Sequence, residues 1–106
     1  MRRFASLRSR GDFTRLRARG RRMATANLTM FRGDAAAADT RPLVGISVSK
    51  SVGKAVVRNR IRRRLAGCIQ ENLPEHARMR LLILARPSAA DATYAALCDE
   101  VRRALG

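Results

Sequence analysis

The sequence predicts a single α+β domain over residues 1–106, built as an αββαβα sandwich with a small central sheet. Two segments that alternate apolar and polar residues and one continuous apolar run are typical of strands, and three segments repeat apolar residues at helical spacing. The chain has no internal repeat and no linker long enough to divide it. At 106 residues it can bury about two-thirds of its unfolded surface around one core.

The first predicted element is a short helix between Ser9 and Gly20. Ser9 and Asp12 have the spacing of a capping box, with Asp in place of Glu, and glycine often follows the end of a helix. Within this segment Phe13 and Leu16 share one face. We therefore expect the helix to cover part of the sheet with these two side chains.

Three strands are predicted. The segment from Thr25 to Arg32 alternates in its apolar residues, and after a turn or loop at residues 33–40 the segment that follows Pro42 alternates again. The run Leu81 to Ala85 is apolar throughout, which indicates a strand buried on both faces.

Two further helices are predicted at residues 53–72 and 91–105. The first has an apolar stripe that includes Val57, Ile61 and Leu65, with Arg63 opposite it and Arg58 close to its edge. Such a local conflict is expected at functional sites, although fraying at the helix start explains Arg58 equally well.

The charge of the chain indicates a polyanionic partner. The formal net charge is +15, and six of the eleven residues from Lys54 to Arg64 are cationic. Like charges one turn apart oppose helix formation, so a helix of this kind needs phosphate groups to neutralise it. We expect this partner to be RNA.

Cysteine and histidine offer no catalytic or metal-binding motif. Cys68 and Cys98 lie thirty residues apart at apolar helix positions, so we expect two reduced core residues and no structural disulfide. His76, the only histidine, follows Pro74 and Glu75 at an expected turn and has no acid or base partner. We expect no catalytic residue and no metal site in the protein.

The sequence also bears on location. No apolar run approaches the roughly 18 residues that span a membrane. The Arg-rich start, residues 1–10, has some character of a transit peptide, but its amphipathic pattern continues into the domain. We expect a cytoplasmic protein without a membrane partner.

The most specific motif is KAVVRNRIRR at residues 54–63, which follows the Ser-rich segment GISVSK at residues 45–50. With these motifs the chain resembles the protein subunit of bacterial ribonuclease P, the enzyme that removes the 5′ leader from precursor tRNA. Asp12, Phe13 and Gly20 are similar to the family's first helix, and Ala85-Arg86-Pro87 to the end of its third strand. The resemblance covers nearly the whole chain and implies the fold called ribosomal S5 domain 2-like.

The resemblance implies that the chemistry lies in a catalytic RNA subunit, with Mg²⁺ bound mainly by that RNA, and that precursor tRNA is the second partner. No obligate protein partner is expected. The implied RNA-binding residues are Lys50, Lys54, Arg58, Asn59, Arg60, Arg62, Arg63 and Arg64. The implied cleft for the single-stranded leader contains Phe13, Arg17, Thr29, Phe31 and Ser47, with Arg17 at a position that is often aromatic in the family.

Alternatives exist both for the two phenylalanines and for the function of the whole chain. Phe13 and Phe31 can instead complete the core under the first helix. The chain can also be a ribosomal or chaperone-like RNA-binding protein with no enzyme partner. A DNA-binding role for the basic helix is disfavoured, because the chain has no dimerisation segment and no helix-turn-helix pattern.

Overall fold

The computed structural model describes residues 2–106; Met1, the first residue of the predicted domain, lies outside the described residues. The chain forms, in order, β1 (Ala5–Ser6), α1 (Arg10–Arg19), β2 (Arg21–Ala24), β3 (Leu28–Gly33), β4 (Leu43–Ser47), the 3-10 turn η1 (Lys50–Val52), α2 (Ala55–Asn72), β5 (Arg80–Ala85), the 3-10 turn η2 (Pro87–Asp91) and α3 (Tyr94–Leu105). The predicted α+β class and the order of the six expected elements are confirmed, with β1 and β2 as additions.

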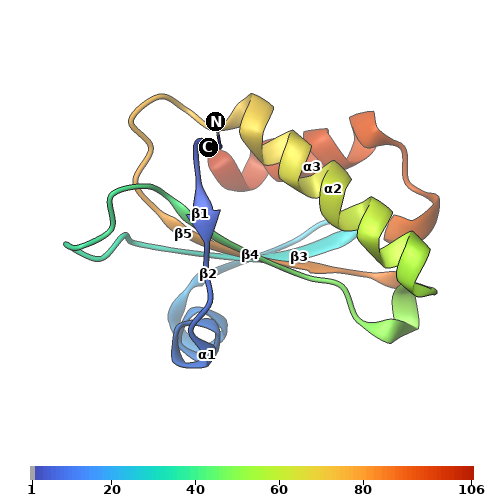
Figure 1. The fold of residues 1–106 in the computed structure, drawn as a ribbon, viewed down its shortest axis with the longest axis horizontal. Helices are drawn as coiled ribbons and strands as arrows, with labels where there is room; N and C mark the ends of the chain where they lie inside the picture. The colour runs from blue at the N-terminus through green and yellow to red at the C-terminus, as the bar shows by residue number, and fades with distance from the viewer. Residues whose placement is uncertain (1) are drawn as a thin grey trace.

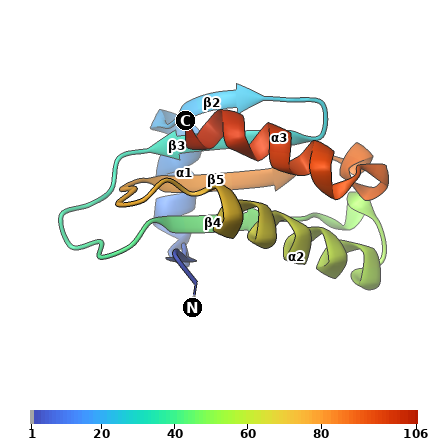
Figure 2. The same ribbon diagram turned by 90° about the horizontal axis from the view of Figure 1, so that it is seen from above.

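The sheet has five strands in the order β1-β4-β5-β3-β2. Strands β4 and β5 pair in parallel and are joined by α2, whereas β3 pairs antiparallel with both β5 and β2. Figure 1 shows α2 and α3 on one face of this sheet and α1 on the other, and Figure 2 shows α1 crossing beneath the strands. The molecule is thus a three-layer arrangement in which α2 faces away from α1.

The prediction for the first strand was wrong at its beginning. It starts at Leu28 rather than Thr25, and the residues before Leu28 form the turn between β2 and β3. Strand β2, with the sequence RRMA, has no apolar alternation of its own. Its strand conformation depends on backbone pairing with β3, which a local sequence pattern does not reveal.

The β2–β3 turn is anchored to α3 by a buried glutamate. Glu100 is 6% exposed and accepts hydrogen bonds from the hydroxyl of Thr25 and from both the backbone and the side-chain amide of Asn27, the latter two at 2.8 and 2.6 Å. Burial alone raises the pKa of a carboxyl group, but these three donors outweigh it, and together with Arg103 they hold the pKa of Glu100 below its usual value.

Two hydrophobic clusters fill the spaces on either side of the sheet. The larger lies between the sheet and α2 and α3 and includes Leu28, Met30 and Ile83. The smaller lies under α1 and contains Leu7, Leu16, Phe31 and Leu82, with Phe13, Leu43 and Leu84 packed against it. The predicted shared face of Phe13 and Leu16 is therefore the face that α1 turns toward the sheet.

The ends of α1 agree with the prediction, although Gly20 acts differently from a left-handed cap. The backbone amide of Asp12 donates to Ser9 Oγ at 3.3 Å. Gly20 is extended, with φ −68° and ψ 157°, and a Cβ there would lie 2.5 Å from the carbonyl oxygen of Leu16. Glycine is needed at this point because the chain turns closely against the helix end.

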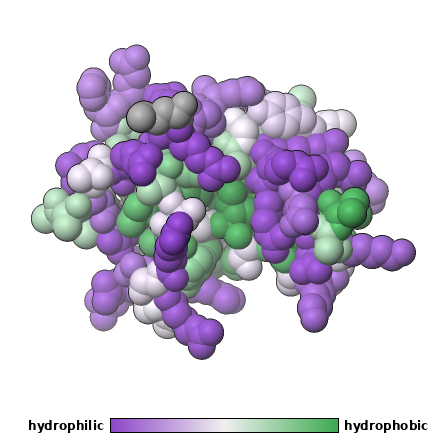
Figure 3. Space-filling model, in the orientation of Figure 1, coloured by the Kyte–Doolittle hydropathy of each residue, from purple (hydrophilic) through white to green (hydrophobic). Residues whose placement is uncertain are grey.

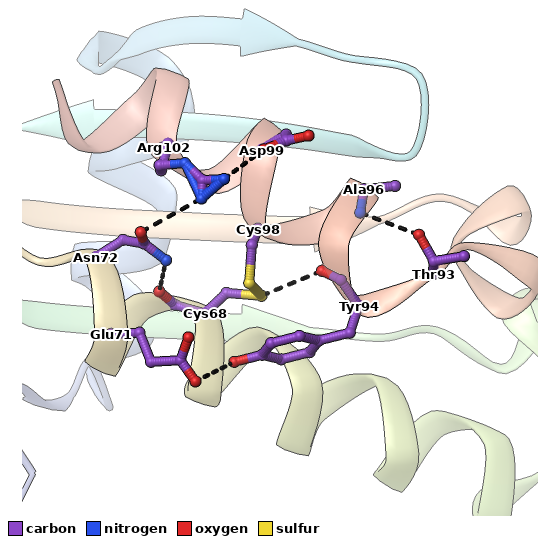
Figure 4. Close-up of a disulfide and its surroundings, with 9 residues drawn as sticks. All are labelled: Cys68, Glu71, Asn72, Thr93, Tyr94, Ala96, Cys98, Asp99 and Arg102. Carbon is purple, nitrogen blue, oxygen red and sulfur yellow. Dashed lines mark hydrogen bonds and ion pairs between the residues drawn. A yellow bond between two sulfur atoms is a disulfide. The ribbon is translucent and has the colours of Figure 1, made fainter.

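The two cysteines require a correction. Both lie at buried helix positions, as predicted, but Cys68 of α2 and Cys98 of α3 are joined by a disulfide, with their Cα atoms 4.9 Å apart (Figure 4). The prediction of two reduced residues was wrong because it considered each helix alone. The spacing between the two positions is set by the packing of α2 on α3, which no local pattern reports.

The disulfide lies within a set of polar contacts between the same two helices. Tyr94 donates its hydroxyl hydrogen to Glu71 at 2.8 Å, and this bond raises the pKa of the Tyr94 phenol (Figure 4). A Cβ at Gly67 would lie 3.0 Å from the Tyr94 hydroxyl oxygen. The glycine in the middle of α2 thus lets the tyrosine approach the helix closely.

Candidate nucleic-acid interface

The motif helix α2 is fixed by its apolar stripe. Ile61, Leu65, Cys68 and Ile69 are buried against the sheet and α3, as the helical spacing predicted. The remaining faces of the first three turns bear the cationic residues of the motif. The stripe therefore decides which way these charges point.

Three of the motif arginines are held by backbone carbonyl groups. Arg60 and Arg64 turn toward η2 and donate to the carbonyl oxygens of Ala90 and Ala92 at 3.4 and 3.1 Å. Arg62 turns the other way and donates to the carbonyl oxygen of Val48 at 3.4 Å. These neutral acceptors orient the guanidinium groups but leave their charge uncompensated.

Asn59 and Arg63 are exposed on α2. Lys50 and Lys54, which come just before the helix, are exposed as well. Asn59 accepts a hydrogen bond of 2.9 Å from Arg62, so the asparagine of the motif makes an internal contact that orients an arginine. No Asp or Glu occurs in the sequence between Asp39 and Glu71. The basic residues therefore lie within a long stretch of sequence without acids, and none of the ion pairs among residues 2–106 includes them.

Arg58 occupies the half-buried edge that its place in the helical pattern predicted. Within the described part of the chain, the Nε atoms of Arg58 and Arg60 are buried and have no hydrogen-bond partner. A buried donor without an acceptor costs about 1 to 3 kcal/mol, and such exceptions call for an explanation in function or local strain.

The second predicted region is the sheet face beside α1. The register places Thr29 of β3, Leu84 of β5 and Ser47 of β4 in one row across this face. Thr29 and Leu84 are half-buried and Ser47 is exposed. Arg86, which follows β5, donates from Nε to Thr29 Oγ1 at 3.2 Å and brings a cation to the same row.

The structure separates the two phenylalanines of the predicted cleft. Phe31 is only 7% exposed and is enclosed by Leu7, Leu16 and Leu82 under α1. Phe13 is half-buried at the sheet-facing side of α1. Arg17, one turn after Phe13, is exposed. Phe31 therefore occupies the core position that the sequence left open as an alternative, while Phe13 and Arg17 border the surface.

A groove connects the edge of α1 with the motif helix. Its lining includes Phe4, Phe13, Ile46, Arg62 and Arg63, and it encloses about 330 Å³. Figure 3 shows this side of the molecule, where an apolar surface meets the hydrophilic surface over the start of α2. Sequence reasoning missed Phe4, because it comes just before β1 and that strand is too short to leave a pattern. The guanidinium carbon of Arg2 lies 5.3 Å from the centroid of the Phe4 ring.

The position of α1 is set by a charged triad. Arg80 of β5 forms ion pairs with Asp12 of α1 at 3.0 Å and with Asp39 of the preceding loop at 2.9 Å. The hydrogen bond from Arg80, followed by that from the backbone amide of Ala36, lowers the pKa of Asp39. Two of the eight acids thus hold the scaffold and leave the basic face of α2 unneutralised.

The described residues meet neither the requirements of a metal cluster nor those of a membrane-crossing helix. Among residues 2–106 no group of three His, Cys, Asp or Glu side chains is arranged to hold a metal ion. His76 is exposed and adopts a positive φ of 59° in the loop after α2. Among residues 2–106, none of the helices combines the length and the hydropathy that a bilayer-spanning helix requires.

The fold and these surfaces define a small basic α+β protein with a cationic helix beside an open sheet face. The family model "Ribonuclease P" matches residues 1–106, and the chain therefore belongs to the ribonuclease P protein family. A ribonuclease P protein component from Acidothermus cellulolyticus is 40% identical over 101 residues, covering 94% of this chain and 84% of the relative. One from Mycobacterium sp. (strain KMS) is 39% identical over 95 residues, covering 89% and 80%.

Solved structures agree with this assignment. The RNase P protein of Staphylococcus aureus superposes with a TM-score of 0.81 at 25% identity, covering 94% of this chain and 91% of that one. The RNase P protein from Thermotoga maritima, at 18% identity, shares the fold with a TM-score of 0.78 and covers 94% of each chain. Among the sequence relatives, a ribonuclease P protein component from Thermus scotoductus is 54% identical over 63 residues, but the match covers only 58% of this chain and 37% of that protein.

Proposed function

We propose that this protein is the RNA-binding subunit of ribonuclease P and assists a catalytic RNA in removing the 5′ leader from precursor tRNA. The observation that carries the proposal is the basic face of α2. Its guanidinium groups are oriented by carbonyl oxygens rather than neutralised by carboxylates. Phosphate oxygens are the acceptors that a planar guanidinium binds in bidentate fashion.

In this proposal α2 binds the RNA subunit. Lys50, Lys54, Arg63 and the solvent-facing ends of the other motif arginines supply the phosphate contacts, and Asn59 keeps Arg62 in place. Folded RNA presents its phosphates and overall shape, whereas its bases are mostly paired. A rigid helix with a row of cations matches that kind of partner.

The leader is assigned to the row of Thr29, Leu84 and Ser47 and to the border formed by Phe13 and Arg17. The half-buried ring of Phe13 offers a surface for stacking, and Arg17 and Arg86 supply charge for the backbone of a single strand. Phe31 supports this surface from below by filling the space under α1. The groove along Phe13, Arg62 and Arg63 joins the two surfaces.

The protein's part in the reaction is binding and positioning. Its carboxylates hold the scaffold through Arg80 and the β2–β3 turn through Glu100, and they form no cluster for a metal among the described residues. We assign the Mg²⁺ of the holoenzyme mainly to the RNA, and we place the assembly in the cytoplasm.

The test combines assembly and activity. Protein purified free of RNA is mixed with a bacterial ribonuclease P RNA at low Mg²⁺, and cleavage of precursor tRNA is followed. We expect cleavage only when both components are present. Cleavage by the protein alone, or no effect of the protein on the RNA-catalysed reaction, would contradict the proposal. The second of these outcomes favours a ribosomal or chaperone-like RNA-binding protein.

Salt dependence tests the role of α2. If about six phosphates are neutralised, log affinity for the RNA subunit falls with log salt at a slope near −5, from about −0.9 per phosphate on duplex. Replacing Arg60 and Arg63 by Ala lowers the magnitude of the slope by roughly one for each phosphate that is no longer neutralised. Arg102→Ala is the control, since Arg102 is paired with Asp99 on the exposed side of α3. A wild-type slope shallower than about −2 means that the face is merely solvated.

A further inference from the structure

A second cationic surface lies where β2 meets the end of α3. Arg21 of β2 and Arg32 of β3 are direct cross-strand partners in the antiparallel pair. Side chains at such positions lie on the same face of the sheet, and like charges placed opposite one another destabilise it. The sheet therefore holds an electrostatically unfavourable pair at one edge.

Two more guanidinium groups face the same place. Arg78 and Arg103, together with Arg21 and Arg32, line a hollow of about 410 Å³ whose only acidic lining residue is Asp34. We call these four arginines the β2 surface. None of the ion pairs formed among residues 2–106 includes any of the four.

The β2 surface is preorganised by neutral groups. Arg32 donates from Nη1 to the carbonyl oxygen of Ala104 at 2.8 Å, and Arg78 donates from Nη2 to that of Ala36 at 3.3 Å. Arg103 lowers the pKa of Glu100, but that carboxylate is buried and already accepts hydrogen bonds from Thr25 and Asn27. As on α2, neutral carbonyl groups orient guanidinium groups without neutralising their charge, so these groups can still bind an anion.

The β2 surface is separate from the motif helix. Strand β2 is at the opposite edge of the sheet from β1 and β4. Figure 2 shows the start of β2 and the C-terminal end of α3 at one corner of the molecule, with the first turns of α2 at the diagonally opposite corner. One straight RNA segment bound along α2 does not reach both.

We propose that the β2 surface binds the sugar-phosphate backbone of a second RNA segment, so that the protein bridges two parts of a folded RNA. Four arginines on two strands, a loop and a helix end match a run of phosphates better than one small anion, because they are spread over several segments around a hollow of about 410 Å³. The identification of this RNA as the ribonuclease P RNA or its substrate rests on the proposed function. The inference that the β2 surface binds phosphate groups is independent of it.

The test uses the variant Arg21→Ala/Arg103→Ala, with Arg102→Ala as the matched control. Arg102 precedes Arg103 in α3 but is neutralised by Asp99. Binding is measured against salt with two probes, the ribonuclease P RNA and an RNA duplex of unrelated sequence. We expect the double variant to lower the slope magnitude by up to about two on the ribonuclease P RNA, and the control to leave it unchanged. Arg21→Ala removes a repulsive pair, whereas Arg103→Ala removes a favourable charge near Glu100. The two effects oppose one another, so thermal unfolding should show that the double variant is still folded.

If the protein binds two RNA segments at once, substitutions in α2 and in the β2 surface should have additive effects on RNA binding. Combining Arg21→Ala/Arg103→Ala with Arg60→Ala/Arg63→Ala should reduce the magnitude of the salt slope by the sum of the two separate reductions, since the sites are distant. An unchanged slope for Arg21→Ala/Arg103→Ala on both probes overturns the inference, even if α2 behaves as proposed. Conversely, a reduced slope on the unrelated duplex supports the β2 surface even if the protein fails to assist ribonuclease P RNA. Loss of folding in the double variant is addressed by Arg21→Lys/Arg103→Lys, which should keep the slope.

Discussion

The ring of Phe13 lies directly over Gly45, so that a Cβ added to the glycine would be 2.7 Å from a ring carbon. This contact joins α1, which packs on β3 and β5, to the neighbouring strand β4. The same contact defines one wall of the groove that leads to Arg62 and Arg63.

Gly45→Ala should therefore destabilise the protein by about 1 to 3 kcal/mol, the usual effect of overpacking a tight contact. Urea unfolding measures the change in free energy. The control is Gly11→Ala in the first turn of α1, where the added Cβ meets only Ser9 Oγ at 3.6 Å. This variant should be neutral or slightly stabilising, because alanine is the better helix former. Equal stability of the two variants would contradict the close contact.

Phe13 and Phe31 should respond differently to replacement by leucine. Phe13→Leu removes a half-exposed ring, so it should weaken binding of precursor tRNA to the assembled enzyme, with little change for mature tRNA that lacks the leader. Phe31→Leu alters a side chain that is 7% exposed, so it should chiefly lower the unfolding free energy, by about 1 kcal/mol or more.

Measuring both tRNAs and the unfolding free energy for both variants separates these roles. If Phe13→Leu weakened both tRNAs equally, the leader would not lie on this ring. If Phe31→Leu left stability intact and reduced leader-dependent binding alone, the leader would stack on the ring of Phe31. The helix α1 would then have to move to expose that ring.

Glu100→Gln should destabilise the protein and reduce its sensitivity to acid. The pKa of Glu100 is lowered in the folded state, so its contribution to stability is present above the unfolded pKa of about 4.3 and is lost as the pH falls through the folded value. At pH 7 the neutral amide should cost about 1 to 3 kcal/mol, because donors from Thr25 and Asn27 lose a charged acceptor.

The measurement is the unfolding free energy of wild type and Glu100→Gln at pH 7 and pH 3. The difference between the two proteins should be larger at pH 7 than at pH 3. The exposed Glu75→Gln variant provides the control and should change neither value. A constant difference across this range would show that Glu100 does not titrate as assigned.

The disulfide should stabilise the protein under oxidising conditions. Cys68 and Cys98 are thirty residues apart, and in the chain-entropy model a loop of this size contributes about 3 to 4 kcal/mol. A reductant should lower the melting temperature of the wild type, whereas Cys68→Ala/Cys98→Ala should be insensitive to it. Two titratable thiols in the oxidised, denatured protein would show that the bond does not form.

The local pattern of the chain determined most of its elements. The apolar stripe of Ile61, Leu65 and Cys68 identified α2 and the direction of its basic face, because side chains at helical spacing must bury one side. The same argument placed Phe13 and Leu16 on the face of α1 that packs against the sheet. Strand β5 was evident from its continuous apolar residues.

Only the tertiary structure decided the features that depend on distant partners. Strand β2 has little pattern of its own and exists through its pairing with β3, and the pairing of Arg21 with Arg32 follows from that register. The burial of Phe31 and the joining of Cys68 to Cys98 depend on how closely α1 and α3 approach their neighbours. A sequence reports the periodicity of each segment because that is a local property, whereas register and interhelical distance arise when segments far apart in the chain pack together.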